Sequence, residues 1–301
     1  MKKTIFTLLF FAITSFLSSS LFAESIVPEE KLSYTFKSDQ VQNLDVNFAA
    51  GKVILQESLT GDININITKD YDAPSPTAKI DKGTLVVKTK LLSSYKKKIS
   101  IVIEIPYGKK LENIQLTCVS ANSTLKRIEA DNINITSASG YVQIDKCKIS
   151  DHLKIGGGAG SLSIKNTEAN YITVSSVSGE TEITACSCKL LRTETVSGKV
   201  VYSKLKTDSF EAQGLSGTLE AQFDKMIEED SWIKTGTGTV NIVFPKGKGY
   251  KAVVSSLSGQ FIDQNTNVTG VQCDDLISQY KNGNVEIKIN TKTGSVSISS
   301  Q

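Results

Sequence analysis

The nine residues TVSGKVVYS at positions 195–203 closely resemble SVSGETEIT at positions 176–184, which lies 19 residues earlier. Related segments centre on Gly140, Gly160, Gly179, Gly198, Gly217, Gly238 and Gly259. The spacings between these glycines are 20, 19, 19, 19, 21 and 21 residues. A fixed period of this length is typical of a solenoid, in which each repeat packs on its neighbours.

Apolar residues alternate with polar ones on both sides of most of the central glycines, at offsets −7 and −5 and again at +2 and +4. The clearest examples are Ile133, Ile135, Leu153, Ile155, Ile172 and Val174 before the glycines, and Val142, Ile144, Leu162, Ile164, Val200, Tyr202, Val240 and Ile242 after them. A period of two indicates β-strands, and the L-x-x-L-x-L pattern of leucine-rich repeats is absent. The sequence therefore predicts an all-β, single-stranded β-helix (β-solenoid) of roughly 12 coils with a period of about 19–21 residues.

A coil of this length has to turn sharply, and glycine adopts positive φ without a Cβ penalty. The predicted structural corners are Asn122, Gly140, Gly160, Gly179, Gly198, Gly217, Gly238 and Gly259. Asn122 is included because asparagine tolerates the left-handed conformation well. Val196 is expected to pack at its corner. The hydroxyl residues that precede most of the glycines are expected to bond the corner backbone or one another.

The chain divides into a leader and one repetitive region. Residues 1–23 have two lysines, a short apolar run and a small-residue end, which is typical of a signal peptide. Residues 24–301 are predicted to form a single β-helix domain. It would comprise less regular N-terminal coils (24–115), regular repeats (116–270) and C-terminal strands (271–301), with the segments around 34–36 and 271–281 capping the two ends.

Charge and cysteine content exclude several classes of protein. The chain has 34 basic and 31 acidic side chains, so nucleic acid is not an expected partner. The GGGAG segment at 156–160 lacks the ending of a phosphate-binding loop, and no metal or other cofactor is predicted. The five cysteines are expected to be small buried hydrophobes that need no disulfide; they are Cys118, Cys147, Cys186, Cys188 and Cys273.

The corners SVSGETEI and TVSGKVVY, the early segment IVIEIPYGKKLENIQL and the late segment VFPKGKGYKAVVSSLSGQF together carry a family resemblance. They resemble the bacterial family of putative adhesins with β-strand repeats, whose function is not known, over about residues 34–300. The resemblance implies a single-stranded β-helix and a location in the cell envelope. This chain differs from the family in one respect. Most of its corners lack the acidic residue that often follows the glycine in the family.

The leading functional prediction is a non-enzymatic exported envelope protein, an adhesin or a surface- or ligand-binding β-solenoid. Its partner would be an envelope or host-surface glycan or protein, and its location the periplasm, the cell surface or the medium. The alternatives are a structural or self-assembling periplasmic protein and a polysaccharide-processing enzyme. The enzyme is disfavoured because acids are scattered and His152 is the single histidine. One candidate site for binding an anionic surface is Lys96, Lys97 and Lys98.

Overall fold

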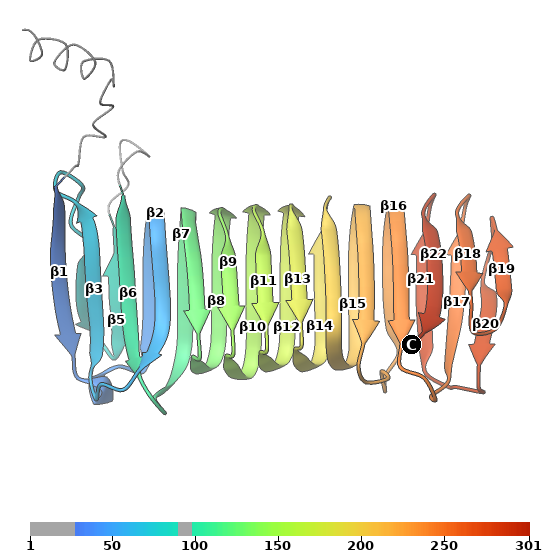
Figure 1. Cartoon of the computed structure of the whole chain (residues 1–301), viewed down its shortest axis with the longest axis horizontal. Helices are drawn as coiled ribbons and strands as arrows, with labels where there is room; N and C mark the ends of the chain where they lie inside the picture. Colours follow the sequence, from blue (N-terminus) through green and yellow to red (C-terminus); the bar gives the residue numbers. More distant parts are fainter. Residues whose placement is uncertain (1–27, 90–97) are drawn as a thin grey trace, which may run out of the picture.

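The computed structural model describes residues 28–89 and 98–301, so the predicted signal peptide lies outside the described residues. The described chain is a row of stacked strands that extends along one axis (Figure 1). Its elements at the N-terminal end are β1 (Glu29–Phe36), a 3-10 helix (Ser38–Gln40), β2 (Asn43–Ser58), β3 (Ile63–Asp70), β4 (Thr77–Asp81), β5 (Thr84–Lys88) and β6 (Ile99–Pro106). No helix in these two ranges is long and apolar enough to cross a membrane.

The middle of the row contains the regular repeats. Its strands are β7 (Lys110–Lys126), β8 (Glu129–Ser139), β9 (Val142–Asp145), β10 (Lys148–Ala159), β11 (Leu162–Lys165), β12 (Glu168–Ser178), β13 (Glu180–Thr184), β14 (Ser187–Thr195), β15 (Lys199–Phe223) and β16 (Ser231–Phe244). The C-terminal end contains β17 (Tyr250–Ser256), β18 (Gln260–Asp263), β19 (Val268–Val271), β20 (Leu276–Tyr280), β21 (Glu286–Thr291) and β22 (Ser295–Ser300).

Each regular coil pairs in parallel with the coil before it and the coil after it. In the coil of β10 and β11, for example, β10 lies between β8 and β12, while β11 lies between β9 and β13. Antiparallel strands occur at the two ends, where β1 pairs with β3, β20 pairs with β17, and β19 pairs with β18. The all-β prediction and the capping of both ends are confirmed. The total of roughly 12 coils stays a prediction, because both ends depart from the regular coil.

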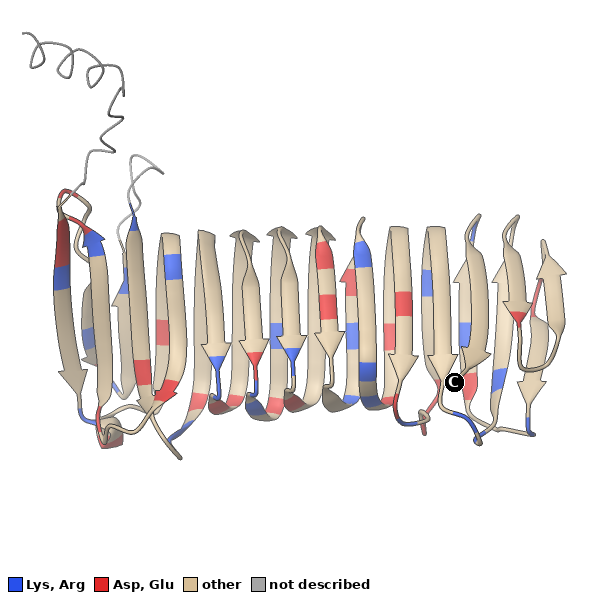
Figure 2. Cartoon of the chain, viewed as in Figure 1, with Lys and Arg blue, Asp and Glu red and all other residues tan. Residues whose placement is uncertain are grey.

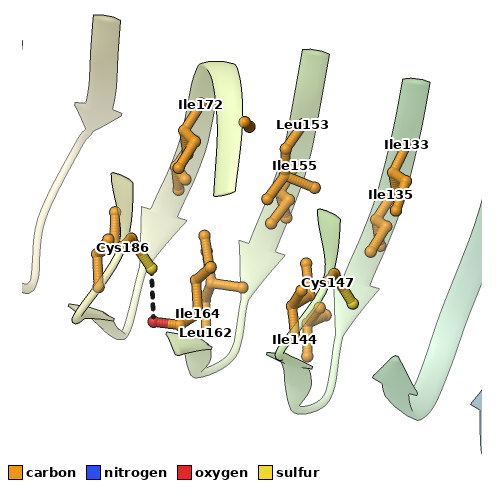
Figure 3. Packing of buried hydrophobic residues seen from close by; sticks show 14 of the residues in the cluster. Ile133, Ile135, Ile144, Cys147, Leu153, Ile155, Leu162, Ile164, Ile172 and Cys186 are labelled. Atoms are coloured by element: carbon orange, nitrogen blue, oxygen red, sulfur yellow. Dashed lines mark hydrogen bonds between the residues drawn. The ribbon is translucent and has the colours of Figure 1, made fainter. Parts of the chain in front are cut away.

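The core consists of the apolar columns that the alternation predicts. Every residue named above at offsets −7, −5, +2 and +4 is at most 8% exposed. Figure 3 shows part of these columns, in which side chains of successive coils, such as Ile135, Ile155 and Ile164, lie in the interior between the strands. Cys118, Cys147, Cys186 and Cys188 are buried as expected, whereas Cys273 is partly exposed. Burial of these columns removes apolar surface from water and supplies most of the stabilisation.

The bend positions form a column in which neighbouring backbones approach closely. A Cβ added to Gly179 would lie 2.0 Å from the carbonyl oxygen of Gly160, and one added to Gly198 would lie 2.1 Å from that of Gly179. Both glycines also have positive φ, at 114° and 136°. Glycine is thus needed at these bends for its conformation and for the lack of a side chain.

Two parts of the corner prediction are wrong. Asn122 is not in the glycine column, because Ala121 is in register with Gly51 on one side and meets Gly140 on the other. Asn122 instead accepts a hydrogen bond from the Tyr141 backbone N–H at 3.0 Å. Gly160 and Gly259 do not have positive φ, so close backbone approach, not left-handed conformation, is what requires glycine there.

Two columns of hydroxyl groups bond the bend backbone. At offset −1, the hydroxyls of Ser139, Ser197 and Ser216 donate to backbone carbonyls of the preceding coil, as the sequence predicts. At offset −3, the hydroxyls of Ser137, Ser176, Thr195 and Thr235 donate to the carbonyl two residues later. The second column was not predicted. It gives these carbonyl oxygens of the bend a hydrogen-bond donor within their own coil.

Gly157 and Gly214 interrupt the −3 column, and a small cavity of about 30 Å³ lies beside each of them. A Cβ at Gly157 would be 3.9 Å from its nearest neighbours, which is ordinary contact distance. At the next residue, Gly158, a Cβ would lie only 2.4 Å from the Ala138 carbonyl oxygen. Adjacent glycines therefore have opposite tolerance for a side chain.

We expect Gly157→Ser to stabilise the protein, because its hydroxyl can donate to the Ala159 carbonyl as Ser137 and Ser176 donate to theirs. Serine reduces the conformational entropy of the unfolded chain, and its hydroxyl adds a hydrogen bond to the folded state. Together these two effects should raise the free energy of unfolding by about 1 kcal/mol and the melting temperature by about 2–4 °C. Gly158→Ser is the matched control and should lower the melting temperature. A calorimetric scan in which both variants melt lower than the parent would contradict this account of the −3 column.

Candidate functional site

An open groove of about 810 Å³ crosses six successive coils just before the bend. Two rows of outward-facing side chains form its walls, at offsets −4 and −2, and the −3 column lies beneath them. The −2 row, called here the apolar row, is Val119, Ala138, Gly158, Val177, Val196 and Leu215. The −4 row, called the polar row, is Thr117, Thr136, Gly156, Ser175, Glu194 and Gln213.

The apolar row exposes aliphatic side chains to solvent in register. Val177, Val196 and Leu215 are 53%, 45% and 65% exposed. The prediction that Val196 packs at the corner is therefore wrong. Offsets −7, −5 and −3 face inward, so strict alternation places offset −2 outside. The small residues Ala138 and Gly158 leave the space that makes the middle of the row a hollow.

The polar row contains hydroxyl, amide and glycine positions and a single carboxylate, Glu194. Such a wall can donate and accept hydrogen bonds, while the opposite wall offers only aliphatic contact. Because successive coils are about 4.8 Å apart, six coils give a groove of roughly 25 Å along the axis of the row. The arrangement suits an extended, uncharged chain that lies across the strands.

Outside the groove, charged side chains pair between neighbouring coils. Lys165 lies 2.9 Å from Glu182, Lys199 lies 3.0 Å from Glu220, and Arg192 pairs with Glu211. The hydrogen bond from Lys165 lowers the pKa of Glu182 below its ordinary value. Figure 2 shows acidic and basic residues interspersed along the strands in this view. The opposite charges within each of these pairs offset one another.

The side chains that could hold a metal ion are not brought together in the described ranges. No group of three or more His, Cys, Asp and Glu side chains there could hold a metal ion. The ring of His152 hydrogen-bonds the Thr173 hydroxyl at 2.9 Å and lies against Tyr171. Burial raises the pKa of the Cys147 and Cys188 thiols to about 12 and that of Cys186 to about 11, so the reactive thiolate is scarce at neutral pH.

The proposed lysine site is only partly within the described chain. Lys96 and Lys97 lie outside the described residues. Lys98 lines a second cleft, of about 610 Å³, near the N-terminal end, together with Lys52 and the acidic residues Glu29 and Asp70. Its backbone N–H donates to the Asp70 carboxylate at 2.8 Å. Binding of an anionic surface by these lysines therefore stays a prediction.

Comparisons with solved structures find similar proteins at low sequence identity. A putative lipid binding protein from Parabacteroides distasonis is 14% identical over 90% of this chain and 96% of its own, with a TM-score of 0.49. A putative adhesin from Parabacteroides merdae is 15% identical over 90% and 95%, with a TM-score of 0.48. A putative adhesin from Bacteroides fragilis is 13% identical over 91% and 99%, with a TM-score of 0.45.

No curated protein matches this chain. One protein-family model does, and it is described as toastrack DUF4097. The match runs over residues 41–299, which includes nearly all of the described strands and every position of the groove. On this match, the chain belongs to the DUF4097 toastrack family.

Proposed function

We propose that the protein is a non-enzymatic binding protein of the cell envelope, an adhesin in the broad sense, and that its ligand lies in the groove between the apolar and polar rows. The observation that carries the proposal is the continuity of this groove across six coils. A chain with a periodic surface fits a periodic ligand. Family membership, the predicted signal peptide and the names of the similar structures support an envelope location.

The residues that line the groove also indicate which chemical class of ligand it can bind. Glu194 is the single charged side chain among its lining residues, so charge attraction is not what holds the ligand. One wall offers aliphatic contact and the other offers hydrogen bonds, which suits a neutral polysaccharide better than an anionic one. A polymer of this kind would gain affinity from several weak contacts repeated along its length.

The test is a binding assay with the mature protein and a panel of immobilised neutral polysaccharides, anionic polysaccharides and extended peptides. We expect a neutral polysaccharide to bind. The double variant Val177→Glu, Val196→Glu should weaken that binding at least about tenfold, because each carboxylate would lose hydration in the complex.

The matched control is Tyr141→Glu, which changes an exposed apolar side chain on the other side of the bend. It should bind as the parent does, and all three proteins should melt at similar temperatures. Equal loss of binding in the control and the double variant would place the ligand elsewhere. Failure of the parent to bind any neutral polysaccharide would overturn the proposed ligand class.

A further inference from the structure

The strands at the C-terminal end do not stack in the order of the sequence. After β16, the chain skips one position in the stack and forms β17 and β18, which are then covered by β19 and β20. The chain next returns, and β21 and β22 enter the skipped position. On one side they pair in parallel with β16, and on the other side they pair in parallel with β17 and β18. Figure 1 shows β21 and β22 between β16 and the β17–β18 coil.

The inserted coil, residues 286–300, is an integral part of the core. Its side chains Ile287, Ile289 and Ile298 are fully buried, and Val296 is 2% exposed. Gly294 continues the glycine column, because a Cβ there would lie 2.2 Å from the Gly238 carbonyl oxygen, and Gly259 stacks on Gly294 in turn. Without this coil, the inner faces of two flanking coils would be exposed. The skipped position between β16 and the β17–β18 coil, called here the slot, therefore has to be filled by a segment with the same apolar columns and bend glycine.

The connection that leads into the inserted coil is conformationally strained. Lys281 and Asn282 are consecutive non-glycine residues with φ of 49° and 50°. The connection then crosses the strand start at Gly249, where a Cβ on Gly283 would lie 1.9 Å from the Gly249 carbonyl carbon. Short hinge loops under strain favour exchange of the segment they carry between two copies of a chain.

We propose that the inserted coil is exchangeable, so that residues 286–300 of one copy fill the slot of a second copy. Within the described residues, this segment is joined to the other coils only through the 281–285 connection. The exchanged form keeps every contact between the inserted coil and its two neighbours and relaxes the strained turn. Its formation is opposed mainly by the high effective concentration of the chain's own segment, which is on the order of mM for short connections.

The test uses the full mature chain with Asn241→Cys and Ser297→Cys. These residues face each other in register, and the Ser297 hydroxyl donates to the Asn241 side chain at 2.7 Å. A disulfide between them links one chain internally when the coil is in its own slot, and links two chains when the coil is exchanged. We expect covalent dimers after oxidative refolding, with a fraction that rises about fivefold or more as the protein concentration approaches the mM range.

Two further variants test whether strain in the 281–285 connection controls the fraction of dimer. Asn282→Pro cannot adopt positive φ and should raise the dimer fraction, whereas Lys281→Gly relieves the strain and should lower it. The control pair Lys154→Cys with Thr173→Cys lies in the same kind of register between β10 and β12. It should give internal disulfides only. Internal disulfides alone at every concentration in the Asn241–Ser297 pair would overturn the proposal, as would equal dimer fractions in the two pairs.

Discussion

Gly198→Val is expected to lower the free energy of unfolding by about 4 kcal/mol or more, and the melting temperature by about 10 °C or more. Valine is β-branched and cannot adopt the φ of 136° that the bend requires. Its Cβ would also lie 2.1 Å from the Gly179 carbonyl oxygen, which belongs to the backbone of the neighbouring coil and cannot move independently. The unfavourable backbone conformation and the steric clash would both occur in the middle of the regular stack of coils.

Two further variants separate the two causes of the destabilisation expected for Gly198→Val. Lys199→Val changes the next residue, which faces outward and pairs with Glu220, and should cost less than about 1 kcal/mol. Gly160→Ala tests close approach alone, because Gly160 lacks positive φ while its Cβ would lie 2.1 Å from the Gly140 carbonyl oxygen. We expect it to be strongly destabilised as well. If it melts as the parent does, conformation and not close approach explains the glycine column.

The sequence could predict the repeating coil because a parallel stack imposes the same environment on equivalent positions. Inward columns at fixed offsets need apolar residues in every coil, and the close approach at the bend needs glycine in most of them. The second turn of each coil left no such signal. It is made by Arg127, Lys146, Asn166, Ala185 and Lys204, all with φ between 50° and 56°. Their side chains face solvent at a position that accepts several residue types, so no repeated residue marks it.

The order of the coils could not be predicted from the period. Gly238 and Gly259 are 21 residues apart, as are Gly217 and Gly238, yet Gly294 lies between the first pair in the stack. A period specifies the length of one coil but not which coil becomes its neighbour. The groove was missed for a different reason. Alternation places Val177 and Val196 outside, but a valine directly before Ser-Gly is also compatible with packing at the corner.

The second large effect is expected for Asp263→Ala, at the C-terminal end. Asp263 is fully buried and accepts hydrogen bonds from Tyr250 Oη at 2.8 Å, Ser278 Oγ at 2.7 Å and the Asn265 backbone N–H at 2.9 Å. Burial raises the pKa of the Tyr250 phenol, so this hydroxyl remains a donor at neutral pH. Alanine would remove the acceptor of the Tyr250 hydroxyl and the Asn265 N–H, and would leave the Ser278 hydroxyl with Thr266 alone as a partner, at a cost of about 3–5 kcal/mol.

The position of Asp263 and its hydrogen-bond partners predicts which part of the protein Asp263→Ala destabilises. Asp263 and Tyr250 belong to β18 and β17, whereas Ser278 belongs to β20, so the carboxylate links the segment of β19 and β20 to the coil of β17 and β18. In a stack, each coil contacts only its neighbours, and a local loss opens the nearest coils first. Hydrogen exchange should therefore accelerate in β17–β22 of Asp263→Ala and stay unchanged in β8–β13. Asp274→Ala, an exposed change in the connection between β19 and β20, should leave both regions protected. Uniform acceleration along the whole chain would contradict a local role for Asp263.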